Sequence, residues 1–283
     1  MKKKPEWLRV PYINNENNQL INKLLDDLKL NTVCTEANCP NRAECFSKKT
    51  ATFMILGKHC TRKCRFCNVA YGVPDPIDIS EPAGIATAVE RLGLRYVVIT
   101  SVTRDDLADG GALHFADTIR SVRKISPDTR IEVLIPDLTN IDKIIKEAPD
   151  VISHNIETVK SLYSEVRPEA NYERSLDVLR NIKKYDPKIY SKSGIMLGMG
   201  ETKDEILKTF DDLLDAGCEF LTIGQYLSPS KNHFDVHEYI NPEIFAEYAE
   251  IAKQKGFIYT ASAPFVRSSY QAEKAFENLT HRN

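Results

Sequence analysis

Residues 51–67 read ATFMILGKHCTRKCRFC, an apolar run followed almost directly by three cysteines. The apolar residues 51–57 have the unbroken character of a strand buried on both faces, and they end in a glycine. The cysteines therefore lie on the loop that leaves this strand. Because parallel α/β folds carry their chemistry on loops at the carboxyl ends of strands, the stretch predicts such a fold with a functional centre at this loop.

The three cysteines of this loop, Cys60, Cys64 and Cys67, are spaced C-x3-C-x2-C. Three clustered thiolates can ligate three irons of a four-iron, four-sulfur (4Fe–4S) cluster and leave the fourth iron open to another ligand. A structural zinc site is the alternative, but its fourth ligand is missing from this stretch. We favour the iron–sulfur interpretation.

A second cysteine group lies upstream: Cys34, Cys39 and Cys45 are spaced C-x4-C-x5-C. Asparagine and proline at positions 38–41 favour turns, so the segment is expected to be an irregular loop organised by a second metal centre. The spacing does not match the usual zinc motifs. The seven cysteines include an isolated Cys218, expected to be a buried, inert thiol, and the odd count argues against a disulfide framework.

From residue 51 onward, apolar strands alternate with amphipathic helices. The pattern predicts an α/β fold, a partial (β/α)6 TIM-type barrel with an N-terminal cluster-binding extension and a C-terminal helical tail. The expected segments are 1–50, 51–262 and 263–283. Strands are expected at 51–57, 96–100, 131–135, 151–156, 190–197 and 220–223, with 257–260 as a possible seventh. Helices are expected at 19–30, 81–93, 111–125, 140–147, 158–165, 171–184, 203–217, 242–255 and 270–279.

Polar residues gather where four of these strands end, at 101–106, 154–157, 198–202 and 224–226. One such group is explained by helix capping, but four on the edge that carries Cys60 predict a small-molecule site. His233 and His237 are four residues apart, yet nothing nearby completes a metal site. They are expected to be surface or loop residues.

Bulk properties restrict the class of protein. The 283 residues carry a formal charge of −2, so there is no bulk polycation for nucleic acid, and 42% hydrophobic residues are enough for a core. No apolar run approaches the roughly 20 residues of a membrane span. The basic N-terminus lacks the apolar segment of a signal peptide, so a cytoplasmic location is expected.

Two cysteine triplets occur together with Arg267-Ser268-Ser269-Tyr270 near the end of the chain. In this combination the chain resembles the lipoyl synthase family, a branch of the radical S-adenosylmethionine enzymes. The segments 36–41, 154–158 and 166–168 resemble that family as well, and the resemblance runs from about residue 7 to the end. Both triplets and the serine motif are needed for it.

The resemblance implies a reaction and two 4Fe–4S clusters. One cluster, held by Cys60, Cys64 and Cys67, binds S-adenosylmethionine at its open iron and generates a 5′-deoxyadenosyl radical. The family inserts two sulfur atoms, at carbons 6 and 8 of an octanoyl chain linked to a lysine of a lipoyl carrier domain. The sulfur comes from an auxiliary cluster, which is consumed. Its ligands here would be Cys34, Cys39, Cys45 and Ser269.

The resemblance also implies contacts to S-adenosylmethionine. Phe66 matches an aromatic position near the adenine, and the segment 198–201, with Gly198, Gly200 and Glu201, matches a glycine-containing motif beside the adenosine. Asn155 and Glu157 are candidate ribose or amino-group contacts. Residues 101–105 do not match the usual Gly-Gly-Glu motif, so the methionine amino contacts stay unassigned.

The implied partners follow from this chemistry: an octanoylated lipoyl carrier domain of a 2-oxoacid dehydrogenase or of the glycine cleavage H protein, an electron donor such as flavodoxin or ferredoxin, and an iron–sulfur carrier that rebuilds the auxiliary cluster. Nucleic acid and membrane are not expected partners. Two alternatives stay open. One is another sulfur-inserting radical enzyme of the biotin synthase type, and the other is a non-catalytic iron–sulfur or zinc protein.

Overall fold

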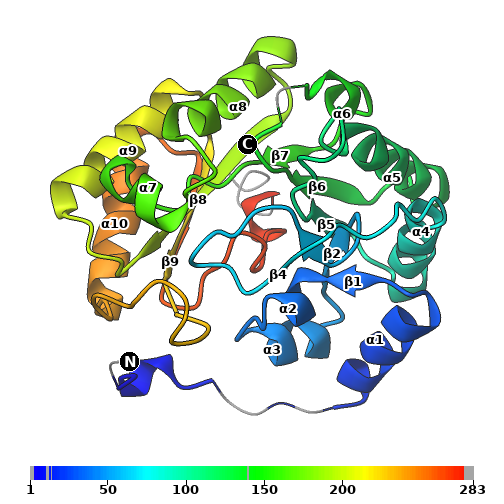
Figure 1. Cartoon of the computed structure of the whole chain (residues 1–283), viewed down its shortest axis with the longest axis horizontal. Helices are drawn as coiled ribbons and strands as arrows, with labels where there is room; N and C mark the ends of the chain where they lie inside the picture. The colour runs from blue at the N-terminus through cyan, green and yellow to red at the C-terminus, as the bar shows by residue number, and fades with distance from the viewer. Residues whose placement is uncertain (1–2, 11–12, 14, 139, 277–283) are drawn as a thin grey trace. The chain divides into compact units, whose positions relative to one another are not determined.

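The computed structural model describes residues 3–10, 13, 15–138 and 140–276 (Figure 1). The chain divides into two compact units. The N-terminal unit consists of Val10–Arg62 and Asn68–Ile152, and the C-terminal unit consists of Met1–Arg9, Lys63–Cys67 and Ser153–Asn283. This division follows compactness and says nothing of the predicted segments 1–50, 51–262 and 263–283, which stay a prediction.

The N-terminal unit contains a parallel sheet whose neighbouring strands are β2, β5 and β6. The short strand β1 is added antiparallel to β2, with Asn31 opposite Met54. A separate parallel pair, β3 and β4, follows the main strand β2. The elements in chain order are α1 (Glu16–Asp27), β1 (Asn31–Thr32), α2 (Val33–Glu36), α3 (Arg42–Ser47), β2 (Thr52–Ile55), β3 (His59–Cys60), β4 (Ala70–Tyr71), α4 (Glu81–Leu92), β5 (Tyr96–Ser101), α5 (Ala112–Ile125), β6 (Arg130–Leu134) and α6 (Asp142–Lys146).

Helices α4 and α5 lie side by side and cover one face of this sheet (Figure 1). Their apolar stripes are fully buried, with Ile85 and Val89 on α4 and Phe115 and Ile119 on α5. Burying each of these side chains stabilises the unit by roughly 1.5–3 kcal/mol before the entropy of ordering is subtracted. Helix α4 ends at Gly93, whose φ of 63° is the left-handed conformation that stops a helix.

The chain passes between the units within β7 (Val151–Ser153). In the C-terminal unit the strands β8, β9 and β10 are parallel neighbours, with Thr222 opposite both Gly194 and Ala261. The remaining elements are η1 (Glu6–Leu8), η2 (Lys160–Leu162), α7 (Tyr163–Val166), α8 (Tyr172–Tyr185), β8 (Tyr190–Leu197), α9 (Lys203–Asp215), β9 (Phe220–Gln225), α10 (Pro242–Lys255) and β10 (Tyr259–Ser262).

The predicted alternation of strands and helices is confirmed, and β10 is the seventh strand. Each predicted strand has an observed counterpart, with ends that shift by up to three residues. The predicted helix at 158–165 is instead η2 followed by α7. Of the helix expected at 270–279, residues 274–276 are helical, residues 270–273 form turns so that the predicted start is wrong, and residues 277–279 lie outside the described residues.

The irregular loop predicted around the first cysteine group is wrong, because Cys34 lies in α2 and Cys45 lies in α3. Thr32 caps α2: its hydroxyl oxygen accepts the N–H of Thr35 at 3.2 Å. The turn residues at 38–41 occupy only the connection between the two short helices. Composition alone therefore overstated the irregularity of this segment.

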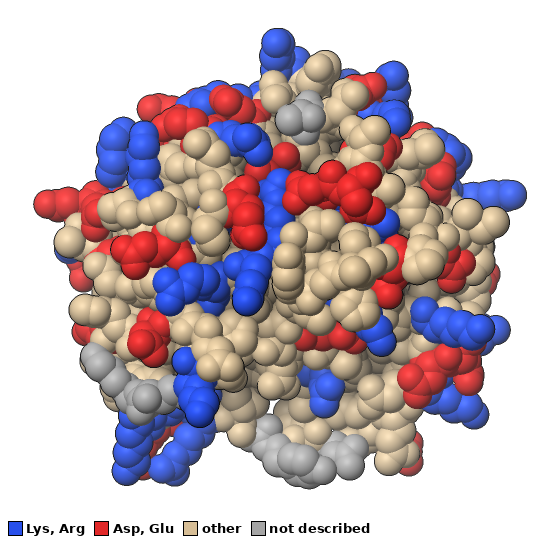
Figure 2. Space-filling model, in the orientation of Figure 1, with Lys and Arg blue, Asp and Glu red and all other residues tan. Residues whose placement is uncertain are grey.

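Two surface properties agree with the sequence. On the face drawn in Figure 2, basic and acidic side chains lie interspersed. Among the residues that the structure describes, no helix is both long enough and apolar enough to cross a membrane.

Candidate functional site

In the N-terminal unit, Cys60 is held at the end of β3. Its carbonyl oxygen accepts the N–H of Gly72 at 3.2 Å, beside the β3–β4 pairing. Its sulfur accepts two backbone N–H groups, from Arg62 at 3.4 Å and from Thr103 at 3.3 Å. Such donors favour a thiolate over a thiol. The thiolate is the form that ligates iron.

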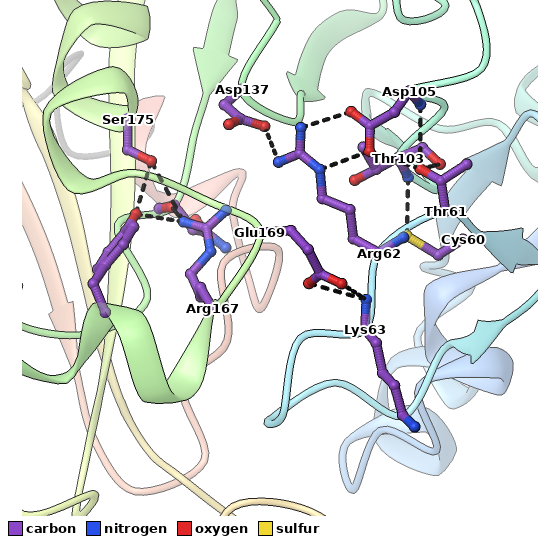
Figure 3. A network of polar contacts seen from close by, with 12 residues as sticks. Cys60, Thr61, Arg62, Lys63, Thr103, Asp105, Asp137, Arg167, Glu169 and Ser175 are labelled. Carbon is purple, nitrogen blue, oxygen red and sulfur yellow. Dashed lines mark hydrogen bonds and ion pairs between the residues drawn. The ribbon is translucent and has the colours of Figure 1, made fainter.

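A network of ion pairs surrounds Arg62, two residues after Cys60 (Figure 3). The Arg62 guanidinium donates to both carboxylate oxygens of Asp105, at 2.8 and 2.7 Å, and also to Asp137. The hydrogen bonds that Arg62 donates to the Asp105 carboxylate are the main cause that raises the pKa of Arg62 above its ordinary value. Sequence analysis missed this network because its members lie 43 and 75 residues apart and follow no periodic pattern.

In the C-terminal unit, a loop between β9 and α10 holds the second half of the cysteine motif. The Arg65 N–H donates to Val166 O at 2.9 Å, and the Phe234 N–H donates to Arg65 O at 2.8 Å. His233 places Nε2 at 3.1 Å from the carbonyl oxygen of Cys67. His233 is thus a loop residue, as predicted, but it supports a cysteine of the motif, a role that its spacing from His237 could not reveal.

Phe66 and the predicted glycine motif meet in one apolar cluster. Phe66 packs against the buried group of Val166, Met199 and Tyr226. The Glu201 carboxylate accepts the N–H groups of Gly198 at 2.5 Å and of Met199 at 2.9 Å, so it closes its own loop. Burial raises the pKa of Glu201.

Gly198 has a φ of 98° and is needed at its position for a second reason, because a Cβ there would lie 2.3 Å from the carbonyl oxygen of Glu238. Gly200, with a φ of 113°, also adopts a conformation that favours glycine. The segment 198–201 is therefore a tight loop at the end of β8, where the sequence placed it.

Asn155 and Glu157 lie together beyond the end of β7. The Asn155 side-chain amide donates to the Glu157 carboxylate at 3.1 Å, and Glu157 has a left-handed φ of 68°. Burial raises the pKa of Glu157, and the charges of Arg167 and Arg267 only partly offset this. Asn155 Oδ1 is buried and has no hydrogen-bond partner among the described residues. This orphaned acceptor is what a donor group of a bound small molecule would satisfy.

The segment before Ser269 runs along the same strand ends. The Gln225 N–H donates to Pro264 O at 3.1 Å, and the Ala263 N–H donates to Ile223 O at 3.2 Å. A Cβ at Gly194 would lie 3.0 Å from Asn155 Oδ1 and 3.1 Å from the hydroxyl oxygen of Ser268. The C-terminal unit thus brings the residue next to Ser269 close to Asn155.

The first cysteine group lies wholly in the N-terminal unit. Burial raises the pKa of the Cys34 thiol to about 11. Burial, followed by the neighbouring charges of Cys34 and Cys39, raises the pKa of Cys45 to about 12. The Cys39 N–H donates to the carbonyl oxygen of Cys34 at 3.1 Å, so the chain folds back between these two cysteines. The raised pKa values keep the Cys34 and Cys45 thiols protonated at neutral pH without metal, so metal binding must release protons from them. Cys218 is buried, as predicted.

The donor chemistry fits the cofactors that the sequence implies. No group of three histidine, cysteine or acidic side chains converges on one metal ion within the described part of the chain, so the ligand sets rest on the motifs. The two N–H donors on Cys60 suit a cluster thiolate. The orphaned Asn155 acceptor suits a polar ligand such as S-adenosylmethionine.

The opposite pKa shifts of Glu157 and Glu205 give a prediction for stability against pH. Burial raises the pKa of Glu157 above its ordinary value of 4.5, so the folded chain loses stability as pH rises above 4.5 through the folded pKa. Hydrogen bonds from Ser161 and Thr202 lower the pKa of Glu205, so its contribution is present above 4.5 and is lost as pH falls through the folded pKa.

We therefore expect Glu157→Gln to become more stable relative to the wild type as pH rises, and Glu205→Gln to become less stable. Thermal unfolding midpoints of the metal-free chains, measured from about pH 4 to about pH 8, check this. Equal slopes for the two variants would contradict the assignment of opposite shifts.

The chain is similar to known proteins in both sequence and structure. Residues 54–213 match the family model of the radical SAM superfamily. The chain is 53% identical to a lipoyl synthase of Alkaliphilus metalliredigens, an alignment that covers 98% of this chain and 97% of the relative. It is 56% identical to a lipoyl synthase of Caldicellulosiruptor saccharolyticus, covering 96% and 97%.

Two solved structures share the fold. Methylornithine synthase superposes with a TM-score of 0.57 at 14% identity, covering 75% of this chain and 71% of that chain. SuiB of Streptococcus suis bound to S-adenosylmethionine superposes with a TM-score of 0.58 at 13% identity, covering 87% and 60%. These two structures confirm the TIM-type barrel fold. The family model and the two relatives show that the chain belongs to the lipoyl synthase family of radical S-adenosylmethionine enzymes.

Proposed function

We propose that this enzyme inserts two sulfur atoms, at carbons 6 and 8 of an octanoyl chain carried on a protein lysine, and so makes the lipoyl cofactor. The observation that carries the proposal is the second cysteine triplet. The radical SAM motif accounts for Cys60, Cys64 and Cys67, but it does not account for Cys34, Cys39 and Cys45. A sulfur-inserting enzyme needs a sulfur source, and an auxiliary cluster on this triplet supplies one.

The radical cluster and S-adenosylmethionine supply, when bound, a primary radical able to abstract hydrogen from an unactivated carbon. The chain's own residues bind and orient. Backbone N–H groups hold the Cys60 thiolate. Asn155 Oδ1 offers an acceptor to the bound small molecule, and the buried Glu157 beside it is held by the Asn155 amide. Excluding water from these groups strengthens each polar contact.

Ser269 would complete the ligand set of the auxiliary cluster. Its oxygen is a harder and poorer ligand for iron than a thiolate, so the iron it holds is the easiest to lose. A cluster that is dismantled during turnover needs such an iron. Support comes from the tail position of Ser269, directly after Ser268 at the strand ends of the C-terminal unit.

We also propose the partners that this chemistry requires. The substrate would be an octanoylated lipoyl carrier domain of a 2-oxoacid dehydrogenase or of the glycine cleavage H protein. Flavodoxin or ferredoxin would supply electrons, and an iron–sulfur carrier would rebuild the auxiliary cluster in the cytoplasm.

One anaerobic experiment tests the function. The reconstituted chain is analysed for iron and sulfide and then given reductant, S-adenosylmethionine and an octanoylated lysine peptide. We expect roughly eight irons per chain, as two four-iron clusters require, together with 5′-deoxyadenosine and a peptide that carries two new sulfur atoms. A biotin synthase-type enzyme would leave the octanoyl peptide unthiolated. A non-catalytic iron–sulfur or zinc protein would give no 5′-deoxyadenosine.

A further inference from the structure

The sulfur of Cys60 receives its two N–H donors from different segments of the N-terminal unit. One donor, Arg62, follows Cys60 by two residues, and the other, Thr103, lies on the loop after β5. The two distances, 3.4 and 3.3 Å, are ordinary for an N–H···S bond, and both can be kept only while the two segments hold their positions relative to each other. Other contacts must therefore hold residues 60–62, which we call the Cys60 turn, against the loop after β5.

Part of this support comes from Thr61. Its N–H and its hydroxyl lie 3.1 and 3.0 Å from the carbonyl oxygen of Thr103, and the hydroxyl also lies 2.9 Å from an Asp105 carboxylate oxygen. The Asp105 N–H donates to the same hydroxyl at 3.2 Å. These contacts tie residues 60–62 to residues 103–105, but they are partly exposed, and a typical intramolecular hydrogen bond contributes only about 1 kcal/mol.

The stronger support comes from Arg62. Its guanidinium forms a bidentate pair with Asp105 and a further bond with Asp137 on the loop after β6 (Figure 3). The Arg62 side chain is 10% exposed, the Asp137 side chain 1% exposed and the Asp105 side chain 49% exposed. The bidentate bonds to Asp105 fix the direction of the guanidinium, and the buried Asp137 adds a second charge-assisted contact from another loop.

The ion pairs of Arg62 distinguish between two roles for this residue. A lone arginine between two cluster cysteines would attract the anionic cluster. Here the guanidinium is already paired with two carboxylates, and these pairs fix its direction. The contacts therefore indicate a geometric role.

We propose that Arg62 is a positioning residue for the radical cluster. Its bidentate pair with Asp105, together with Asp137, holds the Cys60 turn against the loop after β5, so that both N–H donors stay on the Cys60 sulfur. Hydrogen bonds to cluster sulfurs stabilise the more negative, reduced cluster and so set its reduction potential. The proposal rests on the radical SAM assignment and does not depend on the octanoyl chemistry.

The test uses two variants. Arg62→Lys keeps the positive charge but loses the guanidinium that forms the bidentate pair, and Asp105→Asn removes the carboxylate that accepts this pair. Asp106→Asn is the matched control. It is the neighbouring aspartate, it changes the net charge equally, and it breaks an ion pair with Arg104 that does not touch Arg62. Cleavage of S-adenosylmethionine is followed as 5′-deoxyadenosine without any octanoyl substrate, which separates this proposal from the sulfur-insertion reaction.

Two further readouts do not depend on turnover. Potentiometric titration of the reconstituted holoenzyme, followed by electron paramagnetic resonance, is recorded with and without S-adenosylmethionine. The signal that changes when S-adenosylmethionine is added belongs to the cluster with an open iron. Amide hydrogen exchange of the metal-free chains reports opening of residues 60–62 and 103–105.

We expect Arg62→Lys and Asp105→Asn to shift the potential of that cluster to more negative values, to speed exchange in both segments, and to slow 5′-deoxyadenosine formation roughly ten- to a hundred-fold. Asp106→Asn should behave as the wild type. A wild-type potential and exchange pattern in Arg62→Lys would overturn the proposal. So would an equal shift of the potential in Asp106→Asn, because the effect would then follow charge. If the wild type itself yields no 5′-deoxyadenosine, the radical SAM function fails and not the role of Arg62.

Discussion

We expect Cys64→Ala to abolish 5′-deoxyadenosine formation, and Cys39→Ala to retain it while losing the thiolated octanoyl product. The reason is that the two cysteine groups have different proposed roles. Cys64 belongs to the motif that leaves one iron open for S-adenosylmethionine, and without it that cluster lacks a ligand. Cys39 belongs to the upstream group, whose proposed role is to supply sulfur after the radical has formed.

The measurement is product analysis by mass spectrometry under anaerobic single-turnover conditions, with iron counted for each variant. Cys218→Ser serves as the control, because Cys218 is buried outside both groups and its thiol bonds the backbone carbonyl oxygens of Phe220, at 3.3 Å, and Ser191, at 4.0 Å. It should keep both products. Sulfur insertion at the wild-type yield by Cys39→Ala would refute an auxiliary cluster as the source.

The strands and the cysteine loop could be predicted because their signals are local. An unbroken apolar run such as 51–57 fits a covered parallel strand, and the glycine after it marks the loop. Helix α4 was equally readable from Pro82 near its start and Gly93 at its end. The family assignment needed more than local signals, because it rests on cysteines and a serine from distant parts of the chain.

The supports of the site could not be predicted, for a physical reason. Arg62 and Asp137 form an ion pair across 75 residues, and no period of the sequence links them. His233 contacts the carbonyl oxygen of Cys67 from the loop between β9 and α10, and the strand and helix periods of the sequence do not predict the course of a loop. The helices around Cys34 and Cys45 were missed for the opposite reason. They are four and six residues long, so their local signal is weak. Thr32 caps α2, whereas α3 has no side-chain cap and buries Phe46.

Glycines at the strand ends show how closely the tail is packed. Gly224 lies in β9, and a Cβ there would come within 2.1 Å of the carbonyl oxygen of Val266. The atom in the way belongs to the backbone, so no change of side-chain rotamer can relieve the overlap. The tail or the strand must move, at a cost of about 1–3 kcal/mol or more.

We therefore expect Gly224→Ala to displace the tail that carries Ser269. The bonds from Gln225 to Pro264 and from Ala263 to Ile223 would be strained or lost. A misplacement of about 1 Å in a positioning element can reduce a rate about a hundred-fold, so we expect at least that loss of thiolated product. Limited proteolysis should cut the tail faster, and iron per chain should fall towards that of one cluster.

Gly93→Ala separates this effect from the general cost of replacing a glycine. A Cβ at Gly93 meets nothing within 4 Å, and only its left-handed φ of 63° is unfavourable, at roughly 1–2 kcal/mol. Both variants thus lose stability, but only Gly224→Ala moves the tail. If Gly224→Ala keeps its iron content and its product while unfolding at a lower temperature, the tail does not depend on this contact. If it loses both while Gly93→Ala keeps them, close packing of the tail on β9 is what places the serine.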